Sequence, residues 1–277
     1  ATGDAEFLRL TMRAARDLGV EAVSLVHALQ NHDEMTYELV HFATLHAGDT
    51  FTFRRAPILG GELAVLIRAE LTQALTGDNA PYNATFTTNG IASTTASIIA
   101  ASLGLRDLAA LSPQDIEAIK RAHVLLAMYN AWQPGVFALS GWDLVGALPV
   151  DRKQVAALIK DGDTRWIHRG AYDLLDFAPD ASESASKMPK APALYGSLTA
   201  QLADETSFAR QLQQILRVRE HFGLATAEQI DLPDVSNKAM LVMVHRLKDA
   251  DQVTVLNFSA QTISGSVRSL QLQPGSA

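Results

Sequence analysis

Three polar residues, Asn31, His32 and Asp33, follow directly after an apolar run that extends over 23–29. Amide, imidazole and carboxylate groups can all bind sugar hydroxyls, and the carboxyl end of a strand in a parallel α/β barrel is where substrate chemistry is placed. Asp33 is therefore a candidate ligand-facing carboxylate. Because Asp is also a favourable N-cap residue, a His-Asp pair that caps the next helix explains the spacing equally well.

The elements around these residues follow the order of a βα unit. Apolar positions over 4–18 have helical spacing, and the run over 23–29 is nearly continuous, as expected for a parallel strand buried on both faces. We expect a helix over 34–44, so that strand, polar tip and helix succeed one another. A second short buried strand is expected at 136–139, followed by a loop over 140–143.

The rest of the chain predicts an insertion and a change of fold class. The segment at about 46–105 is expected to be an insertion with helices at 62–76 and 90–103, and such insertions often cover an active site. Further helices are expected over 112–129 and 206–222. After Pro233 the apolar period changes to two, and strands at 240–245, 253–258 and 263–270 predict an antiparallel sheet. We place a domain boundary near Ile230, between residues 1–230 and 231–277.

Several motifs, in chain order, resemble those of the α-amylase superfamily, the family 13 glycoside hydrolases. Residues 28–33, Ala-Leu-Gln-Asn-His-Asp, are similar to the last short signature motif of that superfamily, which ends its seventh barrel strand in His-Asp. The continuation over 34–40 is similar to trehalose synthases, the maltose α-D-glucosyltransferases. Further similarities lie at 81–83, 86–90, 133–143, 163–166 and 253–258.

The resemblance implies an α/β plus all-β fold: the C-terminal portion of a (β/α)8 barrel, with its seventh and eighth βα units and the insertion, followed by a small antiparallel β-sandwich domain. The sequence starts without Met and enters helix-like sequence almost at once, so we expect a processed chain or a C-terminal fragment. Two barrel strands cannot close a barrel, and we expect them to pair with the N-terminal part of the barrel or to self-associate.

Retaining α-glucoside chemistry needs a carboxylate nucleophile and a general acid about 5 Å apart. By resemblance, Asp33 corresponds to a third carboxylate that stabilises the transition state, and His32 and Asn31 to groups that bind sugar hydroxyls. We find no well-placed Arg-x-Asp nucleophile motif and no strand that ends in a Glu acid. The segment 163–165, Asp-Thr-Arg, has the nucleophile motif's residues in the reverse order.

The expected function is therefore interconversion of maltose and trehalose by a retaining mechanism, in a fragment that lacks the nucleophile and the general acid. Its substrates would be disaccharides or α-glucans. The alternative is a non-catalytic carbohydrate-binding or subunit-like module.

Other candidate substrate-binding residues are Tyr82 and Asn83 in the insertion and Trp142 after the second strand. Turn and packing roles are equally good interpretations for Tyr82 and Asn83, and a packed aromatic is the simpler reading of Trp142. For Arg165 and Trp166, pinning a loop is favoured over contact with substrate.

Composition excludes several classes. The 277 residues are 48% hydrophobic and 19% charged, as in ordinary globular proteins. A formal charge of −7 without a basic stripe argues against nucleic-acid binding. No segment predicts a signal peptide or a membrane span, and the lack of cysteine fits a cytoplasmic location.

No cofactor or metal is predicted. The sequence has neither a Gly-rich phosphate loop nor a nucleophile elbow. His41 and His46 are five positions apart, which would separate them on an α-helix, so their spacing does not indicate a zinc site.

Overall fold

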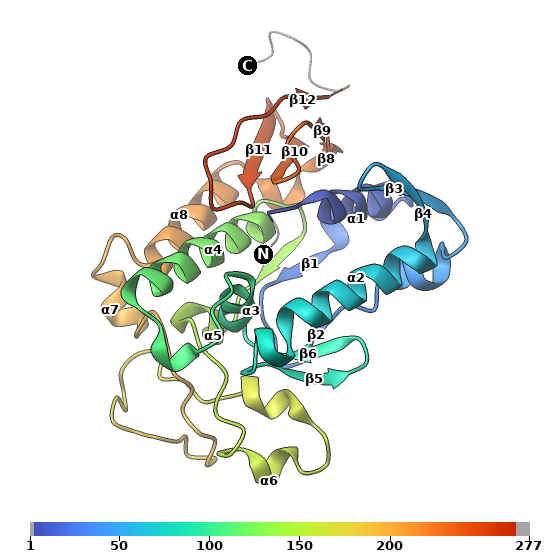
Figure 1. The fold of residues 1–277 in the computed structure, drawn as a ribbon. Helices are drawn as coiled ribbons and strands as arrows, with labels where there is room; N and C mark the ends of the chain where they lie inside the picture. The colour runs from blue at the N-terminus through green and yellow to red at the C-terminus, as the bar shows by residue number, and fades with distance from the viewer. Residues whose placement is uncertain (1–2, 270–277) are drawn as a thin grey trace. The chain divides into compact units, whose positions relative to one another are not determined.

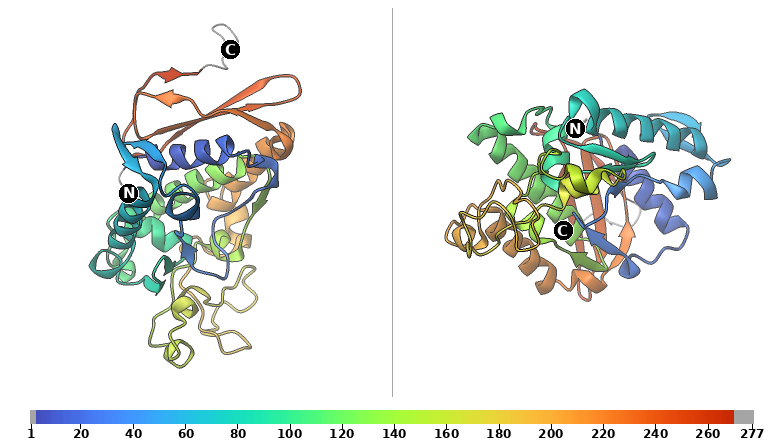
Figure 2. Two further views of the ribbon diagram at one scale, coloured as in Figure 1. Left: turned by 90° about the vertical axis from the view of Figure 1, so that its right-hand side faces the viewer. Right: turned by 90° about the horizontal axis from the view of Figure 1, so that it is seen from below.

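A computed structural model describes residues 3–269 of the chain (Figures 1 and 2). The fold is mixed α/β, with several small antiparallel sheets and one parallel strand pair, and the described residues form no closed barrel. The α-helices are α1 (Glu6–Asp17), α2 (Gly60–Leu75), α3 (Thr95–Ser102), α4 (Pro113–Ala131), α5 (Gly141–Val145), α6 (Ala156–Ile159), α7 (Leu198–Leu202) and α8 (Phe208–His221). The strands are β1 (Val26–Ala28), β2 (Met35–Thr36), β3 (Thr50–Phe53), β4 (Ala56–Leu59), β5 (Ala84–Thr87), β6 (Gly90–Ala92), β7 (Val136–Ala138), β8 (Glu228–Asp231), β9 (Asp234–Val235), β10 (Met240–Arg246), β11 (Asp251–Asn257) and β12 (Val267–Arg268).

Two compact units make up the fold, and each is built from separate stretches of the chain. Unit one contains the described residues of 1–28, 125–138 and 212–277, and unit two contains 29–124 and 139–211. The boundary predicted near residue 230 falls in β8, inside unit one. The compact units do not test the predicted domain boundary, which stays a prediction.

Unit one is organised around the antiparallel sheet β11-β10-β8. Strand β10 pairs along its whole length with β11, from Met240 opposite Asn257 to Arg246 opposite Asp251. Helix α1 packs its apolar face on this sheet (Figure 2), because Leu8 and Met12 join a core that includes Leu241, Met243 and Leu256. Its Arg9 side chain donates a hydrogen bond to the Met240 carbonyl at 3.1 Å, across 231 positions of sequence.

Unit one also contains the parallel pair β1-β7, with Val26 opposite Val136 and Ala28 opposite Ala138. Both valines are exposed, at 66% and 57%. The sequence predicted a parallel strand over 23–29 that is buried on both faces. The parallel strand is confirmed at Val26–Ala28, whereas the predicted length and burial are wrong. Residues Ala22–Ser24 instead form a 3-10 helix, and among the described residues β1 has only one neighbouring strand to cover it.

The approach to β7 depends on Gly135, whose φ is +94°. A Cβ at this position would lie 2.3 Å from the Leu25 carbonyl oxygen, so only glycine allows the two chain segments to come this close. The Arg219 guanidinium holds the same turn through hydrogen bonds to the carbonyls of Ala131, Gln133 and Gly135.

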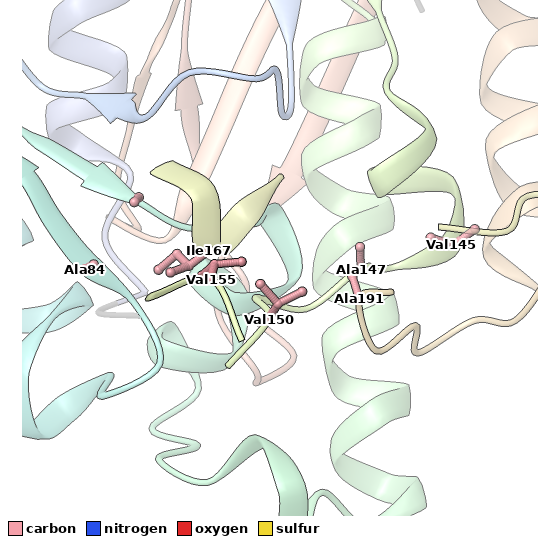
Figure 3. Close-up of a cluster of buried hydrophobic side chains, with 8 residues drawn as sticks. Ala84, Val145, Ala147, Val150, Val155, Ile167 and Ala191 are labelled. Carbon is pink, nitrogen blue, oxygen red and sulfur yellow. The ribbon is translucent and has the colours of Figure 1, made fainter. Parts of the chain in front are cut away.

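Unit two contains the insertion. Strands β5 and β6 form a hairpin whose inner strand pairs with β2, and a core around Tyr37, Leu75 and Ile91 connects this sheet with α2. A second core, shown in Figure 3, gathers Ala84, Val145, Ala147, Val150, Val155, Ile167 and Ala191 from separate segments of unit two. This core anchors the irregular region after α5, where the regular elements are short.

The segment after Asp33 differs from its predicted helix over 34–44. Met35–Thr36 forms β2, and the backbone N–H of Tyr37 donates to the Asn89 carbonyl at 2.8 Å, so hairpin pairing replaces the helical hydrogen bonds. One turn of π-helix follows at His41–Leu45. The first residues of the helix predicted at 90–103, Gly90–Ala92, likewise form strand β6, and the helix itself begins at Thr95 behind a Thr94 cap.

The other predicted elements compare as follows. Helices are confirmed at 6–17, 60–75, 113–131 and 208–221, and strands at 136–138, 240–246 and 251–257. The strand at 136–138 is not buried as predicted, because Val136 is exposed and its two neighbours are half-buried. The loop predicted over 140–143 is wrong, because Ser140 accepts a hydrogen bond from the Asp143 N–H and caps the short helix α5. The strand predicted at 263–270 is reduced to β12, and its last residue lies outside the described part of the chain. None of the described helices combines the length and hydrophobicity that a bilayer span requires.

Candidate functional site

Two arginines and two aspartates of unit two form an ion-pair cluster beside His32, which we call the His32–Asp33 corner. The Arg165 guanidinium donates to Asp33 Oδ1 at 2.9 Å and, through Nε and Nη2, to both carboxylate oxygens of Asp163 at 2.8 and 3.0 Å. Arg169 lies 3.9 Å from Asp33 and 3.7 Å from Asp163. A single pair of cations therefore serves two carboxylates that are 130 positions apart in sequence.

The backbone of the corner is held by side chains on both sides of Asp33. The Asn31 side-chain oxygen accepts a hydrogen bond from the Asp33 N–H at 2.7 Å. The His32 carbonyl accepts one bond from Arg169 Nε at 2.7 Å and another from His168 Nε2 at 3.2 Å. Asn31, which the sequence placed among the sugar-binding groups, thus fixes the turn that presents Asp33.

The short 3-10 helix Thr164–His168 positions Arg165 and the adjoining Arg169 in the corner. Asp163 caps this helix by accepting from the Arg165 N–H, while Ile167 is buried in the core of Figure 3. The Thr164 hydroxyl donates to the Thr85 carbonyl of β5 at 3.0 Å. The Arg165 guanidinium lies over the Phe86 ring, 4.2 Å from its centroid, which adds a cation–π contact.

Glu34 and Gly90, of which Gly90 belongs to the insertion, also border the corner. Glu34, whose side chain is only 12% exposed, lies 3.7 Å from Arg165. Gly90 of the hairpin is so close that a Cβ there would lie 2.7 Å from Glu34 Cγ. Gln30 is buried and donates to the His168 carbonyl while it accepts from the Thr95 N–H, so it connects the corner with the start of α3.

The exposed groups of the corner are the ones that could meet a ligand. The His32 side chain is 73% exposed and the Asp33 side chain 46%, and His32 Nε2 lies 3.4 Å from Asp33 Oδ2. Three carboxylates stand against two guanidiniums, so carboxylates outnumber guanidiniums in the corner. Such a surface can accept hydrogen bonds from hydroxyl groups and favour a developing positive charge.

Asp163 of the corner is not suited to donate a proton. Hydrogen bonds from Arg165 lower the pKa of Asp163, and the same bonds raise the pKa of Arg165. A general acid needs the opposite shift, because it must be protonated near neutral pH. The arrangement therefore keeps Asp163 as a carboxylate bound to Arg165 and does not offer it as the general acid of glycoside hydrolysis.

His168 lies beneath the corner as a neutral histidine. Burial lowers its pKa to about 4, the hydrogen bond to the His32 carbonyl opposes this shift, and the nearby Arg169 and Arg165 strengthen it. Because a carbonyl can only accept, Nε2 carries the proton. The other ring nitrogen, Nδ1, is buried without a partner within the described part of the protein.

Two of the predicted sugar-binding residues have internal hydrogen bonds. Asn83 is 2% exposed; its amide donates to the Leu75 carbonyl and accepts from the Ser97 hydroxyl. The Tyr82 hydroxyl donates to the Leu105 carbonyl at 2.7 Å, and burial raises its pKa to about 12. Contact of the Asn83 amide or the Tyr82 hydroxyl with a sugar would require these bonds to break, whereas the half-buried Tyr82 ring remains partly accessible.

Trp142 is placed differently, because it lines a cleft. Its indole N–H donates to the Gly170 carbonyl at 2.8 Å, and its ring meets Tyr172 edge-to-face at 5.7 Å between centroids. The indole also packs partly on the core of Figure 3. The predicted packing of Trp142 is confirmed, and its role at the rim of a substrate site stays a prediction.

Arg169 and Gln30 were missed by the sequence reasoning. Both act through hydrogen bonds to the backbone of distant segments, and no short motif announces such bonds. Arg165 was interpreted as a residue that pins a loop, and its contacts with Asp163 and Asp33 agree with this interpretation. The sequence signal for these contacts is the Asp-x-Arg spacing at 163–165. The Asp163 carboxylate caps the 3-10 helix and also accepts hydrogen bonds from the Arg165 guanidinium.

The histidines of the π-helix correct another part of the sequence reasoning. In a π-helix, residues five apart lie on the same side, and the His41 and His46 rings are 4.6 Å apart between centroids. His46 also contacts Asp49 at 2.6 Å. Over residues 3–269, no group of three or more His, Asp or Glu side chains is arranged to hold a metal ion.

Comparison of the sequence with protein-family models and with curated proteins finds no match. The resemblance to the α-amylase superfamily accordingly stays a prediction from the motifs. The fold and the site together describe a mixed α/β protein in which two arginines hold the exposed His32–Asp33 pair.

Proposed function

We propose that the chain is part of an α-glucoside-active glycosyl transferase or hydrolase of the trehalose-synthase type, which interconverts maltose and trehalose by a retaining mechanism. In this proposal Asp33 is the carboxylate that stabilises the transition state, and His32 binds a neighbouring sugar hydroxyl. The observation that carries the proposal is the anchoring of Asp33: two arginines fix its carboxylate while about half of the side chain stays open to solvent.

The strand pair β1-β7 supports the barrel part of the proposal. Parallel strands occur almost only in sheets that are covered on both faces, yet Val26 and Val136 are exposed. We propose that these strands are the seventh and eighth of a (β/α)8 barrel and that further strands cover them. The antiparallel sheets of unit one would then belong to a C-terminal β-sandwich domain.

The nucleophile and the general acid are not supplied by the corner, because both of its remaining carboxylates, Glu34 and Asp163, are ion-paired to Arg165. The proposal therefore includes a second polypeptide segment that carries these two groups. Asp33 would hold sugar hydroxyls and favour the oxocarbenium-like ring, and it would not exchange a proton.

The second candidate is a non-catalytic carbohydrate-binding or subunit-like module. It is favoured by the lowered pKa of Asp163, which removes the most exposed alternative acid of the corner. Both candidates predict binding of an α-glucoside at His32 and Asp33, and they differ only in turnover.

The test is incubation of the chain with maltose, followed by proton NMR of the anomeric signals of trehalose and glucose. Asp33→Asn and the exposed control Asp78→Asn are measured in parallel, together with saturation-transfer NMR for binding of maltose and trehalose. We expect binding by the wild type and by Asp78→Asn, at least tenfold weaker binding by Asp33→Asn, and no turnover. Trehalose formation by the wild type would overturn the claim that the catalytic carboxylates are missing, and equal binding by all three proteins would overturn the role of Asp33.

A further inference from the structure

A cleft of about 790 Å³ lies in unit two and is lined by aromatic and hydroxyl-bearing side chains. Its aromatic residues are Trp142, Trp166 and Tyr172, and its polar residues include Gln154, Ser184 and Ser186. This volume is within the range of small-molecule sites, which combine a largely apolar lining with a few placed polar groups. The cleft is distinct from the His32–Asp33 corner, although Arg169 belongs to both.

The aromatic wall is rigid. The Trp142 indole N–H is bonded to the Gly170 carbonyl, and Tyr172 stands against the Trp142 ring at an interplanar angle of 65°. The Tyr172 ring lies so close to Gly141 that a Cβ there would be 2.2 Å from the Tyr172 hydroxyl. A ligand therefore meets preformed ring edges and faces, and binding costs little side-chain entropy.

The charges around the cleft are already neutralised. Arg169 donates to the His32 carbonyl and lies near Asp33 and Asp163, while its guanidinium covers the Trp166 ring at 5.1 Å from the centroid. The Lys187 ammonium contacts Glu183 at 2.5 Å. With both cations paired, the described lining of the cleft has no excess positive charge for a phosphate or carboxylate. Its hydroxyl groups, Ser184 and Ser186, lie 2.9 Å apart in a mutual hydrogen bond and suit an uncharged ligand whose hydroxyls can join that bond.

We propose that this cleft binds a pyranose ring of an uncharged α-linked oligosaccharide. A pyranose has apolar C–H faces that pack on aromatic rings, and its equatorial hydroxyls reach hydroxyl and amide groups such as those of Ser184 and Gln154. The shared Arg169 makes the cleft the neighbour of the corner, so the two would hold successive parts of one saccharide longer than a disaccharide. The choice of an α-glucoside among sugars rests on the proposed function.

The test uses maltotetraose as the probe and isothermal titration with the wild-type chain and two cleft variants. Tyr172→Ala removes one aromatic wall, and Ser186→Trp blocks the cleft by adding bulk at an exposed position. Phe177→Ala is the matched control, because Phe177 is an aromatic residue in the same region, is 87% exposed and does not line the cleft. Circular dichroism verifies that each variant is folded.

We expect both cleft variants to bind maltotetraose at least tenfold more weakly than the wild type, and Phe177→Ala to bind it equally well. Asp33→Asn separates the two proposals, because it leaves the cleft intact and should retain measurable binding of maltotetraose. Loss of binding in Asp33→Asn with wild-type binding in Tyr172→Ala and Ser186→Trp would overturn the cleft and leave the proposed function standing. Competition of inorganic phosphate with maltotetraose would also overturn the proposal.

Discussion

The Arg165 guanidinium binds the Asp33 carboxylate at 2.9 Å while its flat face rests on the Phe86 ring. The Arg165 side chain thereby connects three parts of unit two: Asp33, the 3-10 helix at 164–168 and strand β5 of the insertion. Ion pairs at partly exposed positions contribute little when isolated, and more when geometry fixes both partners. Asp33 is therefore oriented by the fold before any ligand arrives.

We predict that Asp33 and Arg165 are energetically coupled. In a double-mutant cycle of Asp33→Asn and Arg165→Ala, the coupling free energy should be about 1 kcal/mol, because both partners are only partly exposed and Arg165 is held by further contacts. The measurement is urea unfolding of the four proteins. The control cycle of Glu183→Gln and Lys187→Ala concerns an isolated surface pair and should show no measurable coupling. Equal coupling in the two cycles would contradict the special role of Arg165.

The acid sensitivity of the protein should depend on His168. Its pKa is about 4 in the folded state and near 6.5 when unfolded, so the unfolded chain takes up a proton first as the pH falls. The stabilising contribution is therefore complete above pH 6.5 and is lost as the pH falls through 6.5 toward 4. His245, which is buried in β10 and also has a pKa of about 4, contributes in the same direction.

The variant His168→Gln tests this assignment, because glutamine can keep a hydrogen bond to the His32 carbonyl and does not titrate. Between pH 7 and pH 5.5 the free energy of unfolding should fall by about 1 kcal/mol less in this variant than in the wild type. The control is His221→Gln at an exposed histidine. An unchanged pH dependence in His168→Gln would show that His168 is not buried in its neutral form.

Much of the fold could be predicted from apolar period and capping signals, as the helix over Pro113–Ala131 and the strands β10 and β11 illustrate. The segment after Asp33 could not. Its helical spacing is outweighed by pairing with the β5-β6 hairpin, a contact between positions more than fifty residues apart that local sequence does not encode. The predicted pair His32 and Asp33 does lie in one exposed corner, whereas Arg169 and Gln30 are positioned by backbone contacts that exist only in the folded chain.

Gly135 should be indispensable for the β1-β7 pair. Gly135→Ala combines a positive φ with a 2.3 Å approach to the Leu25 carbonyl oxygen, and we expect a loss of about 3 kcal/mol or more in unfolding free energy. Gly19→Ala is the matched control: its φ is +75°, but no atom lies within 4 Å of the added Cβ. That variant should lose only about 1 kcal/mol. Similar losses in both variants would mean that the close approach to Leu25 is not required.

The exposed faces of β1 and β7 should promote association. We expect the chain to form dimers or larger species at high concentration through these strands, because Val26 and Val136 are exposed on an incomplete parallel sheet. Light scattering after size exclusion would measure this, with Val26→Lys shifting the chain toward the monomer. As a control, Val65→Lys changes an equally exposed valine on α2. A monomeric wild type at high concentration would contradict the prediction.

The core between α1 and the sheet β11-β10-β8 joins the two ends of the described chain. During synthesis on a ribosome, α1 is made before β10 and β11, so its apolar face has no sheet to cover it until those strands have been made. The separate stretches of unit two leave the exit tunnel before that moment. Unit one can therefore be completed only after these stretches of unit two have been made, and until then the apolar face of α1 is a target for chaperones.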